Sequence, residues 1–453
     1  MTKILIYNWS RLEKSNPSGG VGIYTKNLIS ELIKNPNNHI FYLNSGYTYT
    51  FNKQPFIKRS PNIFGDKIES FEIVNSPVIA PAQQSVKNTE LFINDQSLYI
   101  LIKKWLNTIG GVDIIHFQNI EGLSLSVLNL KKDYPNTKLI YSLHNYFPIC
   151  PSVNLWAKDH NCHKTDYNDC AHCFRRRNYT ATKYLRAFSN SNITEAINYY
   201  FFRNFVRKND SKTYQLFFEK TREYFKNIDV FLAVSNQVKD IFVRNGYDQN
   251  KIIISYIGTR IAEKSLHHSK ADIYSTPFKI VFMGYMNEAK GFNFFLNSLA
   301  IIPKDISKKI HITICAKYSS ISNKNELNQI KELKKLFHSI ELFNGYDSSN
   351  QAKYLQDQHL GIVPVLWEDN LPQVLIEQIA YGVPVLCSNL GGGKEIVNNP
   401  DFVFEAGNEQ DFINKLLSIY SDRTKLSMFW ENVKKLTTLE EHVNFLNTIY
   451  YSK

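Results

Sequence analysis

An alternation of short apolar runs with segments of helical periodicity constrains the fold of this chain most strongly. In the first half, KILIYN, HIFYL, DIIHF, KLIYSL, VFLAVS and IIISYI alternate with helical patterns that include residues 22–32, 123–130 and 237–243. Nearly continuous apolar strands that alternate with helices are typical of a parallel sheet covered by helices. The first half therefore predicts an α/β domain.

The same alternation begins again in the second half. After a polar stretch at residues 259–276, the runs FKIVFMG, HITICA, IELFNG, LGIVPV and PVLCS repeat the pattern. A chain of 453 residues is also long for one domain. We predict two doubly wound Rossmann-like domains, at residues 1–257 with an insert at 147–227 and at residues 258–435. An amphipathic helix within 436–453 is expected to return to the first domain, and ligands are expected where strand carboxyl ends face the cleft.

The formal net charge of +12 is compatible with nucleic acid, an anionic membrane surface or phosphorylated small molecules as partners. Much of the excess lies in the insert, because residues 174–226 contain twelve Lys and Arg against four acidic residues. The chain carries no nucleic-acid module signature, so we predict no nucleic-acid partner. Its first residues lack the pattern of a signal peptide, and no apolar run approaches the roughly 20 residues that cross a bilayer. We predict a cytoplasmic protein, with peripheral contact at the inner face of the cell membrane as a further expectation.

Acids and glycines are concentrated in WEDNLPQVLIEQIAYGVPVLCSNLGGG, residues 367–393. Glu368 and Asp369 follow the strand LGIVPV, and Glu377 lies on the next predicted helix. If that segment were mostly helical, Asp369 and Glu377 would lie roughly 12 Å apart, about the span from ribose to sugar in a nucleotide diphosphate sugar. The glycines precede a short predicted helix, where backbone amides favour a phosphate; they are Gly391, Gly392 and Gly393. The alternative is that Glu377 is a solvated helix residue and that the glycines form only a tight turn.

With these acids, the stretch resembles the E-x7-E region of retaining glycosyltransferases of family four, which have the GT-B architecture of two Rossmann-like domains facing a cleft. PSGGVGIYTKNL resembles the family's N-terminal glycine loop, which implies that Gly19 and Gly20 border the donor and acceptor sites. YSLHN resembles the T-x-H strand end, which implies that His144 contacts the donor hexose. VFMGYMNEAKGFNFFLNSL resembles the G-R-x4-K-G motif, which implies that Lys290 holds the donor diphosphate, with Tyr285 where arginine is usual.

The resemblance implies a retaining hexosyltransferase that needs no metal or other cofactor for catalysis. It would move a hexose-type sugar from a nucleotide diphosphate sugar to a glycan or lipid-linked acceptor in surface polysaccharide biosynthesis. Lys290 and the amides around Gly392 and Gly393 would stabilise the leaving diphosphate, and Glu377 would accept the ribose hydroxyls. Whether Glu368 or Asp369 holds the sugar hydroxyls stays open.

Other interpretations of these residues are also open. The chain could be an inactive GT-B partner subunit, because Tyr285 and Asp369 depart from the residues usual in the family. It could also be a nucleotide-sugar epimerase or phosphorylase. His144 could be a structural histidine at a strand end. For His116, in DIIHFQN, a structural role and a role beside the acceptor are equally compatible with the sequence.

Four cysteines in the insert have the spacing C-x11-C-x7-C-x2-C, at Cys150, Cys162, Cys170 and Cys173. Four thiolates, two of them in a C-x2-C pair, match the ligand number of a closed structural zinc site. Reduced thiols packed in a loop and disulfides are the alternatives. Nearby histidines could replace one ligand; they are His160, His163 and His172.

The insert also contains two segments, residues 198–212 and 214–227, that mix aromatic residues with Lys and Arg at roughly helical spacing. An interfacial helix has this composition, and a lipid-linked acceptor at an anionic membrane would explain it. The alternative is that the aromatic side chains belong to the core and the charged ones to a solvated face.

Overall fold

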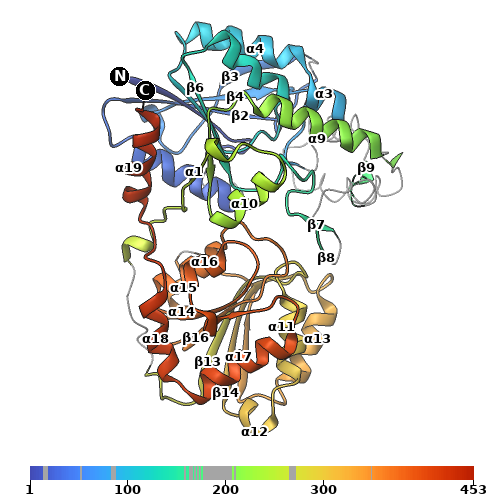
Figure 1. Cartoon of the computed structure of the whole chain (residues 1–453), viewed down its shortest axis with the longest axis vertical. Helices are drawn as coiled ribbons and strands as arrows, with labels where there is room; N and C mark the ends of the chain where they lie inside the picture. Colours follow the sequence, from blue (N-terminus) through green and yellow to red (C-terminus); the bar gives the residue numbers. More distant parts are fainter. Residues whose placement is uncertain are drawn as a thin grey trace.

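The structure, a computed structural model, divides into two lobes that lie one above the other in Figure 1. It describes residues 1–13, 19–51, 54–82, 88–157, 160–162, 167, 170, 173, 175–176, 207–208, 211–264, 272–347 and 349–452. Each lobe is built around one largely parallel sheet that is packed against helices. This arrangement confirms the predicted α/β class with Rossmann-like domains.

The upper lobe contains an eight-stranded sheet in the order β12-β11-β6-β5-β1-β2-β4-β3. Neighbouring strands are parallel except β3 and β4, which pair antiparallel at one edge. The order reverses at β1, which lies between β2 and β5, and α/β sheets bind ligands beyond the carboxyl ends of strands at such a reversal. The strands are β1 Thr2–Tyr7, β2 Asn38–Ser45, β3 Phe56–Arg59, β4 Glu69–Val74, β5 Ile114–Phe117, β6 Lys138–Leu143, β11 Val230–Ala233 and β12 Ile252–Ile254.

The lower lobe contains a six-stranded parallel sheet in the order β15-β14-β13-β16-β17-β18. Here the order reverses at β13, which lies between β14 and β16. The loops that follow β13 and β16 therefore leave the sheet side by side. The strands are β13 Phe278–Tyr285, β14 Ile310–Lys317, β15 Ser339–Phe343, β16 Leu360–Val363, β17 Val385–Ser388 and β18 Val403–Phe404. The predicted domain boundary after residue 257 falls between the two sheets.

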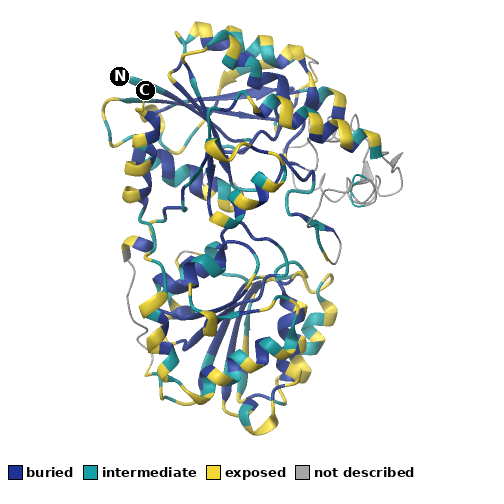
Figure 2. Cartoon of the chain, viewed as in Figure 1, coloured by how far each residue is buried: buried dark blue, intermediate teal, exposed yellow. Residues whose placement is uncertain are grey.

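Helices cover the sheets, and Figure 2 shows them with buried inner faces and exposed outer faces. This one-sided burial explains the helical periodicity of their apolar residues. The main helices of the upper lobe are α1 Gly19–Leu32, α4 Gln96–Thr108, α9 Ser211–Phe225, α10 Asn236–Arg244 and α19 Leu439–Tyr450. Those of the lower lobe are α11 Phe292–Ala300, α13 Lys324–Leu333, α15 Gln373–Ala380, α16 Gly393–Val397, α17 Glu409–Ser421 and α18 Thr424–Asn432.

Two parts of the upper lobe differ from the sequence prediction. Between β2 and β5 the apolar runs predicted no element, yet the chain forms β3, β4, α3 (Thr89–Ile93) and α4. The strand β3 has the sequence FIKR and is mostly exposed, so it lacks the apolar run of a buried strand. Residues 123–130, predicted as a helix, form a 3-10 helix at Leu125–Asn129 and then the single turn α5 at Leu130–Asp133.

The insert predicted at residues 147–227 is described in part. The strands β7 (Trp156–Ala157) and β8 (His160–Asn161) form an antiparallel hairpin, and β9 (Arg175–Arg176) pairs with β10 (Arg207–Lys208). The helix α9 contains most of the aromatic segment 214–227. Its aromatic side chains are buried in the lobe, which fits the core interpretation of this segment rather than the interfacial one; they include Tyr214, Phe217, Phe218 and Phe225. Residues 198–206 and 209–210 of the other aromatic segment lie outside the described residues.

The helix α19 packs along α1 in the upper lobe, and Figure 1 shows it beside both marked chain ends. Tyr450 Oη lies 2.6 Å from Nδ1 of His116, which is fully buried. The other ring nitrogen of His116 lies 2.8 Å from Oγ of Ser142. His116 thus has a structural role, because both of its nitrogens are used in joining β5 to β6 and to α19.

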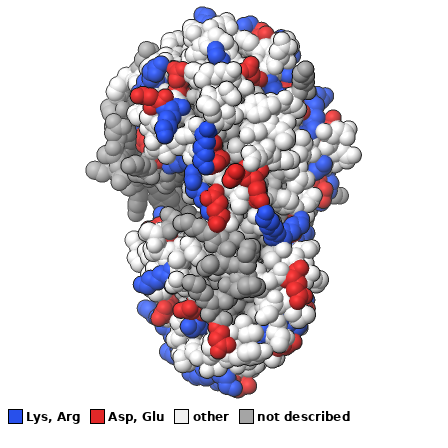
Figure 3. All heavy atoms as spheres, turned by 90° about the vertical axis from the view of Figure 1, so that its left-hand side faces the viewer, with Lys and Arg blue, Asp and Glu red and all other residues white. Residues whose placement is uncertain are grey.

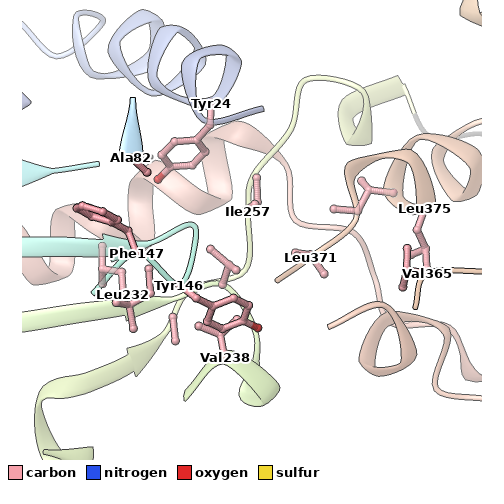
Figure 4. Close-up of a cluster of buried hydrophobic side chains, with 14 of the residues drawn as sticks. Tyr24, Ala82, Tyr146, Phe147, Leu232, Val238, Ile257, Val365, Leu371 and Leu375 are labelled. Carbon is pink, nitrogen blue, oxygen red and sulfur yellow. The ribbon is translucent and has the colours of Figure 1, made fainter. Parts of the chain in front are cut away.

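One hydrophobic cluster extends across both lobes. Figure 4 shows part of it at the junction, where Ile257 and Val238 of the upper lobe lie on the side that faces Leu371 and Leu375 of the lower lobe. Burial of a shared apolar surface favours one relative placement of the lobes. None of the helices in the described part of the chain combines the length and apolarity needed to span a bilayer.

The two chain segments that cross between the lobes run together. Thr259 lies where the chain first passes from the upper to the lower lobe, and Thr438 lies just before α19, where the chain has returned. The two residues form a parallel bridge. Gly258 packs so closely against α19 that an added Cβ would lie 2.4 Å from Cβ of His442. The lobes are therefore joined by two adjacent segments.

Candidate active site

Lys290 and Asp369 meet at the carboxyl edge of the lower sheet. Lys290 lies in the loop between β13 and α11, Asp369 lies in the loop between β16 and α15, and the order of the sheet makes these loops neighbours. Nζ of Lys290 donates a hydrogen bond of 2.6 Å to Oδ2 of Asp369 and lies 5.1 Å from the centre of the Trp367 ring. The edge of the sheet therefore holds a fixed, partly exposed cation beside a nearly buried acid.

Glu368, next to Asp369, is directed to other partners. Its Oε2 accepts a hydrogen bond of 2.9 Å from the amide of Gly391 and one of 3.0 Å from Nε2 of Gln237 in the upper lobe. Glu368 therefore links three segments. They are the loop between β16 and α15 that contains Glu368 and Asp369 (the acidic loop), the loop of Gly391–Gly393, and α10. The two adjacent acids have separate roles in this geometry.

The three glycines allow two loops to touch. A Cβ at Gly391, where φ is +67°, would lie 2.0 Å from the carbonyl oxygen of Asp369, and a Cβ at Gly392 would lie 2.4 Å from that of Asn370. The predicted short helix α16 begins at Gly393. The amide of Gly391 binds Glu368 and that of Gly392 donates to the Asp369 carbonyl at 2.9 Å. The prediction that these glycines leave free amides for a phosphate is thus not met at Gly391 and Gly392.

Glu377 lies on α15, but the segment that joins it to Asp369 is helical only from Gln373. The roughly 12 Å expected for a continuous helix between the two acids therefore does not apply. Glu377 Oε2 accepts a hydrogen bond of 3.1 Å from the hydroxyl of Tyr346, in the loop after β15. Burial raises the pKa of Glu377 to about 7, and the hydrogen bond from Tyr346 opposes that rise. The carboxyl group thus has a raised pKa in a half-buried position.

His144 directly follows β6 at the carboxyl edge of the upper sheet and is half-buried. Its Nε2 lies 2.9 Å from Oε1 of Gln118, and the ring of Tyr24 packs against it edge to face with centroids 4.5 Å apart. Burial lowers the pKa of His144 to about 3, and the nearby His442 adds to this shift. A neutral His144 is a weak base, and with Gln118 as acceptor its Nδ1 is an acceptor for a hydroxyl group.

The predicted glycine loop of the upper lobe faces the lower lobe. Gly19 and Gly20 are exposed at the start of α1, and a Cβ at Gly20 would lie 3.2 Å from Nε2 of Gln373 at the start of α15. Tyr285 is exposed at the end of β13. Residues 14–18, which precede Gly19, lie outside the described residues.

Polar contacts between the lobes gather at the start of α10. Oγ of Ser235 donates to the carbonyl of Asn370 at 2.9 Å. Glu395 of α16 accepts from the backbone amides of Asn236 and Gln237 at 2.9 and 2.7 Å. A carboxylate at a helix N-terminus is favourable. The acidic loop, α16 and α10 therefore form one connected unit across the junction.

A sequence model described as Glycosyltransferase Family 4 matches residues 18–262, more than half of the chain. The chain belongs to glycosyltransferase family 4. The model described as Glycosyl transferases group 1 matches residues 263–436. These matches confirm the family whose motifs the sequence resembles, and they show that the chain is a glycosyltransferase.

Solved structures with the same fold match nearly the whole glycosyltransferase. The sucrose-phosphate synthase of Thermosynechococcus elongatus is 13% identical with a TM-score of 0.62, over 99% of this chain and 98% of that chain. Anabaena HepE in complex with UDP and glucose is 14% identical with a TM-score of 0.58, over 100% of both chains. The lipopolysaccharide outer core galactosyltransferase WaaB is 13% identical with a TM-score of 0.60, over 99% of both. At these identities the likeness shows the GT-B fold alone. A comparison with curated proteins gave no match.

All four cysteines of the insert motif lie among the described residues. Cys150 is buried and the other three are half-buried. Burial raises the pKa of the Cys150 thiol to about 12, and the nearby Cys162 and Cys173 contribute to the rise. Within the described residues, no group of three or more His, Cys, Asp or Glu is arranged to hold a metal ion. Zinc binding by this glycosyltransferase stays a prediction.

Sequence reasoning missed several residues that position the site. Tyr346 binds Glu377, Gln237 binds Glu368, and Glu395 binds the start of α10. Glu395 had a usable signal, because it is an acid two residues after the glycine triplet. Tyr346 and Gln237 had none, because each meets its partner only through the packing of distant segments.

Proposed function

We propose that this glycosyltransferase moves a hexose-type sugar from a nucleotide diphosphate sugar to a glycan or lipid-linked acceptor, with retention of configuration, in surface polysaccharide biosynthesis. The observation that carries the proposal is the pairing of Lys290 with Asp369 at 2.6 Å where the order of the lower sheet reverses. A cation at that position is suited to a diphosphate, and the neighbouring acid is suited to sugar hydroxyls. The relative HepE was solved with UDP-glucose, which supports a nucleotide-sugar donor.

In this proposal, Lys290 stabilises the leaving diphosphate as the bond from the anomeric carbon to the phosphate oxygen breaks. Charge develops on that oxygen, and a positioned ammonium group lowers the barrier most where the charge develops. This cation supports our proposal of metal-independent catalysis. Gly393, at the start of α16, remains a candidate amide donor, since the amides of Gly391 and Gly392 have partners within the protein.

We assign the ribose hydroxyls to Glu377, as the motif implies, and the sugar hydroxyls to Asp369 rather than Glu368. Both oxygens of a carboxylate accept hydrogen bonds, and paired hydroxyls donate them. Glu368 is engaged with Gly391 and Gln237, whereas Asp369 shares its partner Lys290 with the proposed diphosphate site. His144 approaches from the upper lobe as a neutral acceptor for a hexose hydroxyl.

If the acceptor is lipid-linked, transfer is proposed to take place at the inner face of a membrane. Support comes from the basic insert, although the aromatic face of α9 is buried in the lobe. Figure 3 shows Lys and Arg interspersed with Asp and Glu on the face that carries α19, so this face offers no uniformly basic surface. Binding to anionic and neutral vesicles, compared in one assay, tests this part of the proposal.

The structural zinc is proposed to be held by the four cysteines. The sulfur donors suit zinc, which binds thiolates and would lower their pKa. A zinc ion there would stabilise the insert and would take no part in sugar transfer.

A nucleotide screen tests the proposed function. Thermal shift and calorimetry would compare UDP, ADP and GDP with UDP-glucose, ADP-glucose and GDP-mannose, for the wild type and for Lys290→Ala and Glu377→Ala. We expect one nucleotide to stabilise the wild type and both variants to lose that effect. Hydrolysis of the matching nucleotide sugar, with the anomer identified by NMR, then tests turnover and retention. Binding without turnover would favour the inactive-subunit alternative.

A further inference from the structure

Tyr24 connects the C-terminal helix with the histidine at the proposed sugar site. Tyr24 lies in α1 and is almost fully buried. Its hydroxyl lies 2.7 Å from Nε2 of His442 in the first turn of α19, and its ring packs edge to face on His144. The ring of Tyr24 also lies edge to face with that of His442, with centroids 5.5 Å apart. Three segments that are far apart in the sequence therefore meet around one side chain.

His442 is itself fixed in place. It is 3% exposed, and Gly258, in one of the two segments that join the lobes, lies against it so closely that a Cβ there would be 2.4 Å from Cβ of His442. On the other side, His144 is held by Gln118 at 2.9 Å. The ring of Tyr24 in α1 and the amide of Gln118 just after β5 thus contact the same imidazole ring.

We infer that His442 and Tyr24 are positioning residues for sugar transfer, which set the orientation of His144 toward the donor hexose. This inference rests on the proposed function, in which His144 contacts that hexose. A hydrogen bond between Tyr24 and His442 fixes the position of the end of the tyrosine side chain, and the tyrosine ring then limits the rotation of the His144 ring. Neither residue needs to touch the donor.

The test separates binding of the sugar from binding of the nucleotide. UDP and UDP-glucose, or the ADP or GDP pair if the screen selects it, would be titrated against wild type, Tyr24→Phe and His442→Phe. Tyr24→Phe keeps the ring on His144 and removes only the hydroxyl. We expect the nucleoside diphosphate to bind as in wild type, and hydrolysis of the nucleotide sugar to fall about tenfold, as for the loss of one hydrogen bond in a positioned network. His442→Gln, which keeps a hydrogen-bonding group, should restore most of the rate.

Matched variants make the result specific. Tyr451→Phe removes the hydrogen bonds that join the residue just after α19 to Asn38 at 2.6 Å and to Asn35 at 3.4 Å, and it should leave hydrolysis unchanged. The double variant of Tyr24→Phe with His442→Phe should be no slower than either single variant, because both remove the same contact.

Two results would count against the inference in different ways. In the first, all variants unfold at the wild-type temperature, and His144→Ala impairs hydrolysis whereas Tyr24→Phe and His442→Phe do not. The positioning role is then wrong and the proposed function stands. If His144→Ala itself leaves hydrolysis and nucleotide-sugar affinity unchanged, the hexose contact assigned to His144 is wrong, and the positioning role falls with it.

Discussion

Nζ of Lys290 lies 2.6 Å from Oδ2 of Asp369, so the cation proposed to hold the donor diphosphate is already paired with an acid of the neighbouring loop. A diphosphate that binds Lys290 competes with this carboxylate. We therefore expect Asp369→Asn to bind UDP about two- to fivefold more tightly than wild type, because a partly exposed ion pair contributes up to about 1 kcal/mol. The same variant should hydrolyse UDP-glucose more slowly, because the sugar loses its acceptor.

Lys290→Ala should lower turnover on the order of 100-fold, the typical effect of removing one group that stabilises developing charge. Lys335→Ala is the matched control, since Lys335 also pairs with an acid, Glu332, but at an exposed site on the lower lobe. Steady-state hydrolysis of the nucleotide sugar measures both variants. Equal turnover in the two variants would mean that Lys290 is not the diphosphate ligand.

Nucleotide-sugar affinity should rise with pH through about 7. Burial raises the pKa of Glu377 to about 7, so its carboxylate form is gained as the pH rises from 6 to 8. Hydroxyl groups that donate to a carboxylate are held more strongly than those that donate to a neutral acid, so we expect a roughly tenfold gain in affinity. Calorimetry with UDP-glucose is the suitable measurement, because UDP carries a terminal phosphate that itself titrates at about pH 6.

Two variants assign this pH dependence to Glu377. Glu377→Gln should abolish it, since an amide does not titrate. Tyr346→Phe should move the midpoint to higher pH, because it removes a hydrogen bond that lowers the pKa of Glu377. A midpoint that stays in place in both variants would show that another group is responsible.

Gly391→Ala should destabilise the lower lobe and disturb the acidic loop together. Its φ of +67° disfavours alanine by about 1–2 kcal/mol, and the added methyl would also lie 2.0 Å from the carbonyl oxygen of Asp369. Gly407→Ala is the matched control, with φ of +79° and no atom within 4 Å of an added Cβ. Urea unfolding should show a loss in both variants, whereas UDP-glucose binding should weaken only in Gly391→Ala. If both variants bind equally well, the contact between the two loops has no role in donor binding.

Glu395→Ala should loosen the junction between the lobes. The carboxylate accepts hydrogen bonds from two amides at the start of α10 and from the hydroxyl of Tyr256 at 2.8 Å. Loss of a comparable capping contact costs about 1–2 kcal/mol, so we expect a lower unfolding temperature and a larger radius of gyration by X-ray scattering. Glu409→Ala, in the first turn of α17 at the surface of the lower lobe, should leave the radius of gyration unchanged. An unchanged radius in Glu395→Ala would argue that the apolar junction alone holds the lobes.

Purified protein should contain about one zinc ion per chain if the cysteines of the insert form the proposed four-ligand site. Cys173→Ser should lower the metal content, because it removes one member of the C-x2-C pair. Cys315→Ser is the control, since Cys315 lies buried on β14 in the lower lobe. Metal analysis by plasma emission measures both. A metal-free wild type with six titratable thiols would favour the reduced-thiol alternative.

The buried strands could be predicted because helices cover both faces of each sheet. Nearly every residue of such a strand is therefore apolar, which gives a continuous apolar run in the sequence. This holds for β13, with the sequence FKIVFMGY, and fails for the exposed edge strand β3. The periodicity of residues 123–130 predicts a helix, but apolar residues also line the tight turns of a 3-10 helix, which residues 125–129 form.

The site residues were partly predictable for a similar reason. Lys290 and Asp369 each lie in a recognisable motif, but they are 79 residues apart, and only the adjacency of β13 and β16 brings their side chains together. The glycine triplet is evident in the sequence, but its contacts with the loop that contains Asp369 and Asn370 could not be predicted from the sequence. Those contacts depend on the carbonyl groups of Asp369 and Asn370, which every residue type carries.

The return of α19 to the upper lobe has a consequence for how the protein is made. Residues 439–450 complete the packing of α1 and His116, yet they are translated after the whole lower lobe. The lower lobe is thus nested within the upper one along the chain, and it can reach its fold on the ribosome first. The upper lobe is begun earlier, but the surface of α1 that packs against α19 stays exposed until α19 has been synthesised. Chaperones that bind exposed apolar surface can therefore bind α1 during that time.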